Sequence, residues 1–174
     1  MTTSGIFAVA NQNLSSSIST GNVDVKLEIY KEDNGEEVLY GENTTRVMPG
    51  DKLSFIPKVN NLAEDCYVRF KVDYIDESTD FRDYAEGFST IYEKNGDYYY
   101  YKEILKSKES IKLFDSIKIP DDIENRGNIK LEIRVEAVQA KNFEPNYDKE
   151  DPWLGIEPTE SINNSYNKED FLCF

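Results

Sequence analysis

The sequence predicts an all-β protein, specifically a jelly-roll-like antiparallel β-sandwich with short helical or loop insertions. Two observations lead to this prediction: apolar residues recur at every second position in several segments, and clusters of Asn, Asp, Gly and Pro separate those segments. Alternation turns one face of a strand toward a core and the other toward solvent. Many short strands with few helices are typical of sandwiches, and 174 residues fit one domain.

The clearest alternation lies in segments 23–29, 66–74 and 129–137, where one side of each predicted strand is aliphatic or aromatic and the other is mostly charged. Weaker patterns predict strands at 53–59, 98–101 and 111–119. Segments 80–87 and 101–107 are candidates for short helices, although neither has a long apolar stripe at helical spacing.

Turn-forming residues lie between these strands, because Asn, Asp and Gly tolerate the positive φ that tight turns require. The sequence places such turns at four positions: Asp33-Asn34-Gly35, Met48-Pro49-Gly50-Asp51, Asn60-Asn61 and Asn95-Gly96-Asp97.

The two ends differ from the predicted sandwich in composition. Residues 1–20 form an uncharged arm rich in Ser, Thr and Asn, residues 21–145 hold the sandwich, and residues 146–174 form an acidic tail with two prolines. We expect that tail to lie on the surface and to be partly disordered.

Charge and composition exclude several classes of function. The chain has 20 Lys and Arg against 34 Asp and Glu, a net charge of −14, so binding to nucleic acid is not predicted. It has no histidine, which removes Ser-His-Asp triads, Cys-His pairs and His-ligated zinc. No apolar run is long enough to span a membrane, and we expect a soluble or already processed chain that needs no cofactor.

Two cysteines and two acidic clusters are candidate sites. Cys66 lies in the inward row of a predicted strand, and we interpret it as a small buried residue. The alternative is a disulfide between Cys66 and Cys173. The clusters at 121–124 and 148–151 offer oxygen ligands for calcium, but neither has EF-hand spacing, and such charge runs are mostly solvated surface.

The N-terminal arm carries an uncharged, β-prone patch at 5–10 ahead of a polar spacer at 11–19. A strand without charge or proline pairs readily with an open sheet edge. It either packs as the first strand of its own domain or adds to the sheet of a neighbouring copy, and the residues alone favour neither.

Three segments, in this order, resemble the TasA/camelysin family of secreted proteins of Gram-positive bacteria, which includes biofilm matrix fibre proteins. The first is Ser4-Gly5-Ile6-Phe7-Ala8-Val9-Ala10 followed by Ser19-Thr20-Gly21-Asn22-Val23-Asp24-Val25. The second is Met48-Pro49-Gly50-Asp51-Lys52-Leu53, then Val59-Asn60-Asn61 and Tyr67-Val68-Arg69-Phe70-Lys71-Val72. The third is Ile133-Arg134-Val135-Glu136-Ala137-Val138-Gln139-Ala140. Their order and spacing over roughly 140 residues carry the resemblance, and the tail from 158 to 174 has no counterpart in it.

The resemblance implies a secreted, extracellular protein with a jelly-roll fold, cleaved by a dedicated signal peptidase so that the mature chain starts near Thr3 or Ser4. It also implies head-to-tail filaments in which the arm of one subunit inserts as a donor strand into the next, with the chain itself, and other biofilm matrix components, as partners. Carried onto this sequence, the donor strand consists of Gly5, Ile6, Phe7, Ala8, Val9, Ala10, Asn11, Gln12, Asn13 and Leu14. The alternative is a monomeric secreted binding or accessory protein of the same fold.

Camelysins are also described as metalloproteases, so the resemblance raises an enzymatic alternative. This chain has neither an HExxH motif nor any histidine. Catalytic zinc would need an unusual site of carboxylates or cysteine alone. The sequence therefore predicts a structural protein and no enzyme.

Overall fold

The structure is a computed structural model that describes residues 4–6, 23–40, 45–74, 80–121, 131–156, 158–160 and 169–173. Strands dominate this part of the chain, and its single short 3-10 helix is η1 (Phe81–Asp83). The strands are β1 (Ser4–Ile6), β2 (Val25–Asp33), β3 (Glu36–Leu39), β4 (Thr45–Val47), β5 (Lys52–Ser54), β6 (Ile56–Asn61), β7 (Cys66–Tyr74), β8 (Ala85–Glu86), β9 (Tyr92–Asn95), β10 (Tyr98–Tyr101), β11 (Ser110–Lys112), β12 (Ser116–Lys118), β13 (Leu131–Gln139), β14 (Thr159–Glu160) and β15 (Glu169–Cys173).

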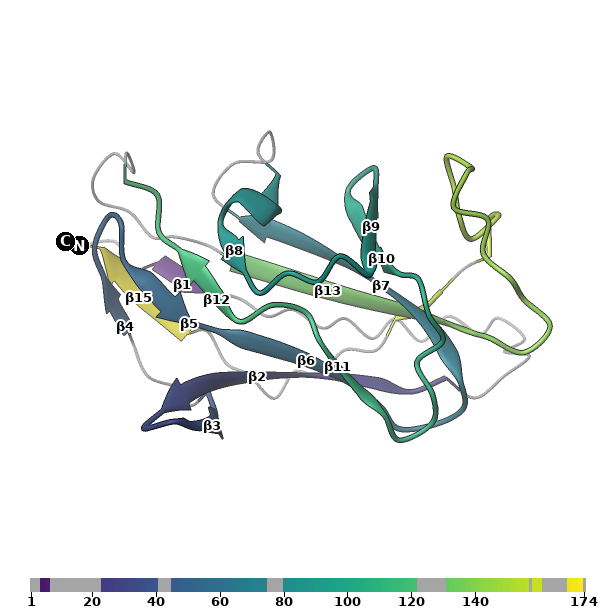
Figure 1. Cartoon of the computed structure of the whole chain (residues 1–174), viewed down its shortest axis with the longest axis horizontal. Coiled ribbons are helices and arrows are strands. Elements are labelled where there is room, and N and C mark those ends of the chain that lie inside the picture. Colours follow the sequence, from purple (N-terminus) through teal and green to yellow (C-terminus); the bar gives the residue numbers. More distant parts are fainter. Residues whose placement is uncertain are drawn as a thin grey trace.

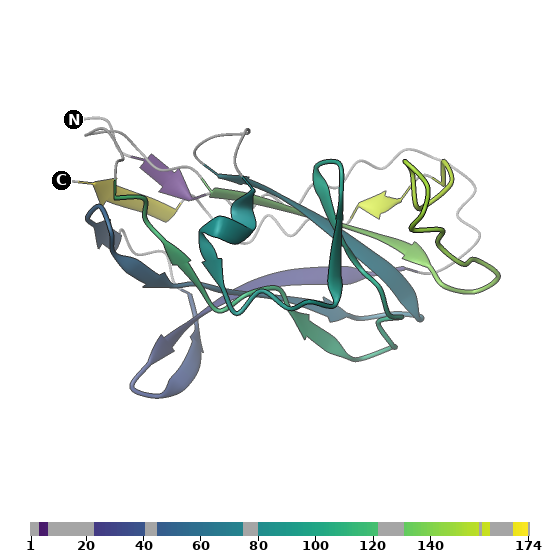
Figure 2. The ribbon, with the colours of Figure 1, turned by 45° about the horizontal axis from the view of Figure 1, so that its top comes forward.

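Two antiparallel sheets form the layers of a β-sandwich (Figures 1 and 2). The five-stranded sheet has the order β14-β13-β7-β10-β9, and the four-stranded sheet has the order β11-β6-β2-β3. A three-stranded sheet, β5-β12-β8, extends the second layer where β5 leads into β6. The predicted all-β sandwich is confirmed, and the only parallel pair in the described part of the chain is β15 with β4.

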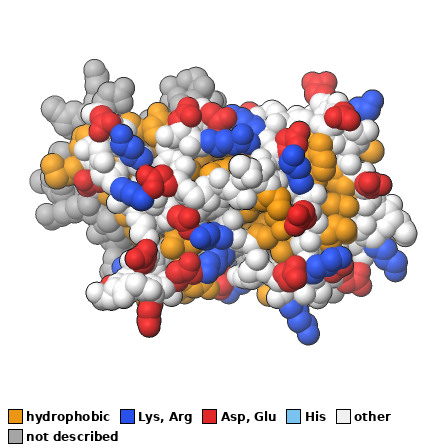
Figure 3. Space-filling model, in the orientation of Figure 1, with side chains coloured by type: hydrophobic (Ala, Val, Ile, Leu, Met, Phe, Trp, Pro, Cys, Tyr) orange, Lys and Arg blue, Asp and Glu red, His pale blue; other side chains and the backbone are white. Residues whose placement is uncertain are grey.

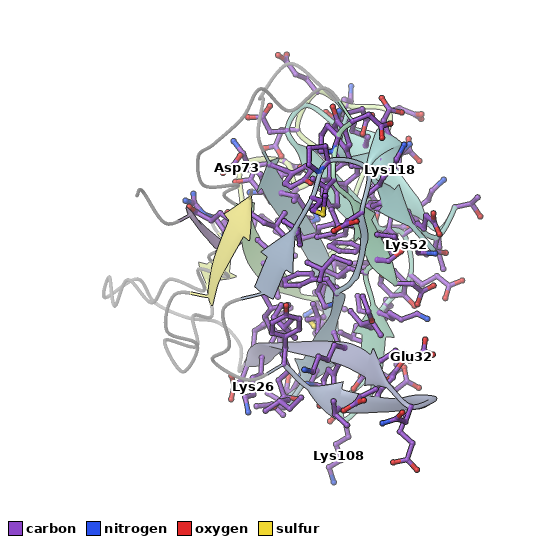
Figure 4. The ribbon with its side chains drawn as sticks, turned by 90° about the vertical axis from the view of Figure 1, so that its left-hand side faces the viewer. Lys26, Glu32, Lys52, Asp73, Lys108 and Lys118 are labelled. Carbon is purple, nitrogen blue, oxygen red and sulfur yellow. The ribbon has the colours of Figure 1, made fainter. Side chains whose placement is uncertain are left out.

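The core between the layers follows from the alternation in the sequence. Leu131, Ile133, Val135 and Ala137 of β13 are buried, and so are the inward residues of β2 and most of those of β7. Aromatic rings fill the centre, where the Phe70 ring stacks on Tyr99 at 5.3 Å between centroids. Figure 4 shows that side chains fill the space between the layers.

The longest pairing joins β7 and β13, from Leu131 opposite Tyr74 to Gln139 opposite Cys66. The predicted strand 66–74 coincides with β7, and the predicted strand 129–137 corresponds to β13. Because one residue of slippage would turn each apolar row to the wrong face, the buried rows fix this register.

Two strands predicted as continuous are broken. Segment 53–59 divides at Phe55, whose N–H donates to the carbonyl of Asp115, and segment 111–119 divides at Leu113–Asp115. Both breaks lie where the four-stranded sheet gives way to β5-β12-β8, so Phe55, Leu113 and Phe114 all point into the core.

The predicted turns are confirmed at three of four positions. Asn34 and Gly35 both have positive φ, 54° and 85°, in the hairpin between β2 and β3, as a type I′ turn requires. The predicted turn at Asn60-Asn61 is wrong, because both residues end β6. Asn61 is buried there, and its amide donates to the carbonyls of Glu64 and Leu105.

The helical predictions are partly correct. Within 80–87 one turn of 3-10 helix forms, and the carboxylate of Asp80 accepts from the N–H of Arg82 at its start. Segment 101–107 forms no helix, because Leu105 instead exchanges backbone hydrogen bonds with Cys66 at 2.8 and 3.0 Å.

The start of the predicted surface tail packs against the sandwich. Trp153 is only 1% exposed and lies with Tyr67, Tyr100 and Val138 in a second apolar cluster. That cluster covers one end of the outer face of the five-stranded sheet. Most residues of 146–156 are exposed, as a surface tail predicts, but Pro152 and Trp153 are buried. The aromatic residues on the outer face of β7 and β10 offer the indole a place to bury, which the sequence analysis did not predict.

Replacing Trp153 by Ala should lower the free energy of unfolding by about 3–5 kcal/mol, the usual cost of truncating a buried aromatic residue. Urea unfolding followed by circular dichroism measures it. Leu154→Ala is the matched control, since Leu154 is 57% exposed and should change stability by less than about 0.5 kcal/mol. Equal effects of the two substitutions would show that residues 146–156 do not cover the sheet.

Candidate assembly site

The N-terminal arm enters the structure through β1, which contains Gly5 and Ile6 of the predicted donor strand. Strand β1 pairs antiparallel with β15 of the same chain, with Ser4 opposite Phe171, Gly5 opposite Asp170 and Ile6 opposite Glu169. Phe7, Ala8, Val9, Ala10, Asn11, Gln12, Asn13 and Leu14 lie outside the described residues. The described part of the arm thus has the strand conformation that both interpretations of the sequence require.

Strand β15 lies between β1 and β4. Its pairing with β4 is parallel, with Phe171 opposite Thr45 and Cys173 opposite Val47. The side chain of Val47 is buried in the main core, and β4 leads into the turn at Pro49-Gly50. In Figures 1 and 2 these three strands lie together at one end of the sandwich.

Strand pairing at the outer side of both layers is short among the described residues. Strand β13 meets β14 at Glu136 and Ala137, and β2 meets β3 from Tyr30 to Asp33. Backbone N–H and C=O groups make these pairings, and the same groups join β1 to β15.

The strongest polar cluster lies beneath Trp153. The guanidinium of Arg69 on β7 donates from Nε and Nη2 to Oε2 of Glu136 on β13, both at 2.6 Å, and from Nη1 to the Tyr100 hydroxyl at 2.9 Å. The Tyr98 hydroxyl donates to the other Glu136 oxygen at 2.9 Å. Both carboxylate oxygens are therefore bonded within the protein.

Aromatic rings cover the same guanidinium. Its Cζ lies 4.1 Å from the ring centroid of Tyr98 and 4.4 Å from that of Trp153. Burial opposes the charge, but Glu136 and the hydroxyl of Tyr100 outweigh it, so the pKa of Arg69 is raised. With its charge matched and covered, the Arg69–Glu136 pair fits a structural role that attaches residues 146–156 to the sheet.

The polar outer face of the four-stranded sheet is also paired within itself. Glu28 accepts from Lys26, Tyr30 and Asn60 at 2.7–2.9 Å, and the hydrogen bond from Lys26 is the main reason that its pKa is lowered. Lys58 bonds to Glu37 and lies over the Tyr30 ring. On the side of the molecule seen in Figure 3, positive and negative side chains are likewise interspersed.

The two cysteines are placed differently. Cys66 is a free, fully buried thiol, as the interpretation as a small core residue predicts, and it forms no disulfide with Cys173. Burial, with a smaller contribution from Asp65, raises its pKa to about 12, so it holds its proton at neutral pH. Cys173 belongs to β15.

One carboxylate of each acidic cluster is engaged in local contacts. Asp121 pairs with Lys118 at 2.8 Å, and Asp151 accepts the backbone N–H groups of Trp153 and Gly155 at 3.0 and 2.5 Å. Residues 122–124 lie outside the described ranges. Among the described residues no group of three or more Cys, Asp or Glu side chains is placed to hold a metal, and no helix is long and apolar enough to cross a membrane.

Comparison with family models, with curated proteins and with solved structures finds no match for this chain. The resemblance to the TasA/camelysin family therefore stays a prediction from sequence.

Sequence reasoning missed two features of this region. It did not identify β15 as the partner of the arm, and the only local signal was the short apolar run Phe171-Leu172-Cys173 after a polar stretch. It also placed Arg69 on the solvent side of its strand. Only the register of β7 against β13 brings Glu136 opposite Arg69, and that register is not readable from either strand alone.

Glu136→Gln should lower the free energy of unfolding by about 3–5 kcal/mol, because it leaves the Arg69 charge buried without its partner. The double variant Arg69→Met with Glu136→Leu should recover most of that loss. Glu93→Gln is the control, since the Glu93–Lys102 pair is 2.8 Å long but exposed and worth about 0–1 kcal/mol. If the double variant were no more stable than Glu136→Gln, the pairing would not explain the loss.

Stability should fall at alkaline pH. Burial is the main cause that raises the pKa of the Cys66 thiol from 9.0, and of the Tyr147 phenol from 10.0, to about 12, and it raises the pKa of Tyr92 and Tyr99 as well. Each group is neutral when protonated, and its pKa is lower in the unfolded chain than in the folded protein, so the unfolded chain loses the proton first as pH rises. The stabilising contribution of each group is therefore complete below its unfolded pKa and is lost as pH rises through its folded pKa.

Urea unfolding between pH 7 and pH 11 should therefore give constant stability up to about pH 9 and a decline above it. Tyr147→Phe removes one of these groups and should make the decline less steep. Stability that rose above pH 9 would contradict the assignment.

Proposed function

We propose that this chain is a structural subunit of an extracellular filament, in the biofilm matrix or on the cell surface, which polymerises by inserting its N-terminal arm into the sheet of the next subunit. The subunit binds copies of itself head to tail, with other matrix components as further partners. The proposal assigns the chain no catalytic role and no cofactor.

The observation that supports it most is that the start of the uncharged arm takes strand conformation. Strand β1 pairs antiparallel with β15 over three residues, Ser4–Ile6, through its backbone. A strand inserted into the sheet of another copy would gain main-chain hydrogen bonds in the same way, while alternate side chains fill pockets and set the register.

Head-to-tail insertion leads to a filament because the contact does not close on itself. Each subunit would give one arm and receive another, so every added copy presents a new acceptor. The net charge of −14 does not oppose this at the arm, since residues 1–23 carry no charged side chain.

The intrachain pairing of β1 with β15 favours a second candidate, a monomeric secreted binding or accessory protein of the same fold. In that case the arm would complete its own domain and would not leave it. The two candidates differ in one observable, which is whether purified protein forms filaments that depend on the arm.

Phe7→Asp or Val9→Asp should abolish filaments seen by negative-stain electron microscopy, because a buried unpaired charge costs several kcal/mol. A loss of about 3 kcal/mol raises the concentration needed for assembly by about hundredfold. Deletion of residues 1–14 should have the same result. Ser16→Asp, beyond the predicted donor strand, is the matched control and should leave assembly intact.

Filaments that persist after deletion of residues 1–14 would overturn insertion of the arm. Wild-type protein that remains monomeric by light scattering at every concentration tested would favour the monomeric candidate.

A further inference from the structure

We propose that β15 is an intrachain clasp, which holds the start of the N-terminal arm in the unassembled subunit and must release it before the arm inserts into another copy. This inference rests on the proposed function and concerns its regulation. It assigns a role to the C-terminal strand, which the resemblance does not cover.

The clasp is seen in the strand order β1-β15-β4. Glu169, Asp170 and Phe171 take Ile6, Gly5 and Ser4 as antiparallel partners, and the opposite edge of β15 pairs with Thr45–Val47. Strand β4 is fixed to the sandwich through the buried Val47 and through the turn beyond it, where the Gly50 N–H donates to the carbonyl of Ile119 at 3.0 Å. The arm is thus tied to the core of its own subunit through β15.

Pairing with β15 and full insertion into a neighbour exclude each other. A strand inserted between two others uses both of its edges, and the N–H and C=O groups that Ser4–Ile6 shares with β15 cannot serve a second strand at the same time. The clasp therefore removes the first residues of the predicted donor strand, Gly5 and Ile6, from the pool available for assembly.

The clasp is also short enough to open. It joins the arm over three residue pairs, and β15 holds β4 over another three. Such short ladders are marginal by themselves. An intersubunit strand reaching to Leu14 would form a longer ladder and so would outcompete the clasp once a second copy is near.

The clasp would therefore oppose filament assembly at low subunit concentration. If nine of ten subunits are clasped at a given moment, the apparent affinity for a neighbour falls about tenfold, because only the released fraction can bind. Newly made subunits would then stay monomeric until their local concentration rises.

A disulfide across the clasp tests this in the full chain. Gly5 and Asp170 face each other in the ladder, where paired Cα atoms lie roughly 4.5–5.5 Å apart, within the range of a disulfide. We would introduce Gly5→Cys and Asp170→Cys together in a Cys173→Ser background. Cys66 stays in place, since it is buried and free.

The monomer should form the Gly5→Cys to Asp170→Cys disulfide under mild oxidation, shown by mass spectrometry. The oxidised protein should not form filaments, and a reducing agent should restore assembly. Each single cysteine variant in the same background is a control that should assemble equally with and without oxidant. A disulfide that fails to form in the monomer, or oxidised protein that assembles as fast as reduced protein, overturns the clasp.

Opening the clasp gives the opposite effect. Phe171→Pro removes a backbone N–H and disfavours a strand at β15, so the initial rate of filament growth should rise about tenfold. Phe171→Thr keeps the N–H and a β-prone residue, and its rate should stay closer to that of the wild type than to that of Phe171→Pro.

The outcomes separate the two proposals. Filaments that grow equally fast from wild type, Phe171→Pro and Phe171→Thr overturn the clasp and leave donor-strand assembly standing. If neither the wild type nor any of these variants forms filaments, the proposed function is wrong. The regulatory role of the clasp is then wrong as well, even where the disulfide has formed.

Discussion

The antiparallel pairing of β7 with β13 is the constraint on which most of this structure depends. One face of the pair supplies the main core, with Phe70, Ile133 and Val135 buried between the layers. The other face is covered at one end, where Arg69 and Glu136 meet beneath Trp153. This strand pair can change register only by exposing apolar residues on one face and separating Arg69 from Glu136 on the other, so it fixes the strands around it.

The ends of the chain are organised around that pair in different ways. Residues 146–156 follow β13 and fold back over the outer face of the sheet, where the Tyr147 hydroxyl donates to the carbonyl of Tyr101. The N-terminal arm and β15 instead form a small sheet with β4, which has a parallel pair and only three residue pairs on each side. The first arrangement buries an indole, whereas the second is held by a few backbone hydrogen bonds, and this contrast is the reason that we place regulation at β15.

The absence of histidine and the acidic composition exclude several classes of function, but they do not identify one. Several described carboxylates are used in hydrogen bonds and ion pairs, such as those of Glu28, Asp80 and Glu136. An arm without charged side chains is suited to interactions through the backbone. That is the chemistry on which both the assembly proposal and its monomeric alternative depend.

The sequence by itself determined the fold class, the inward rows of β2, β7 and β13, and the hairpin at Asn34-Gly35, because alternation and turn chemistry are local properties. The sequence also identified the arm, because a stretch without charged residues can be recognised from the sequence alone. Tertiary structure alone decided the breaks at Phe55 and Leu113, the burial of Trp153, the pairing of Arg69 with Glu136 and the meeting of β1 with β15. Each of these joins segments far apart in the chain, and the free energy that selects such a contact depends on how both segments pack against the core.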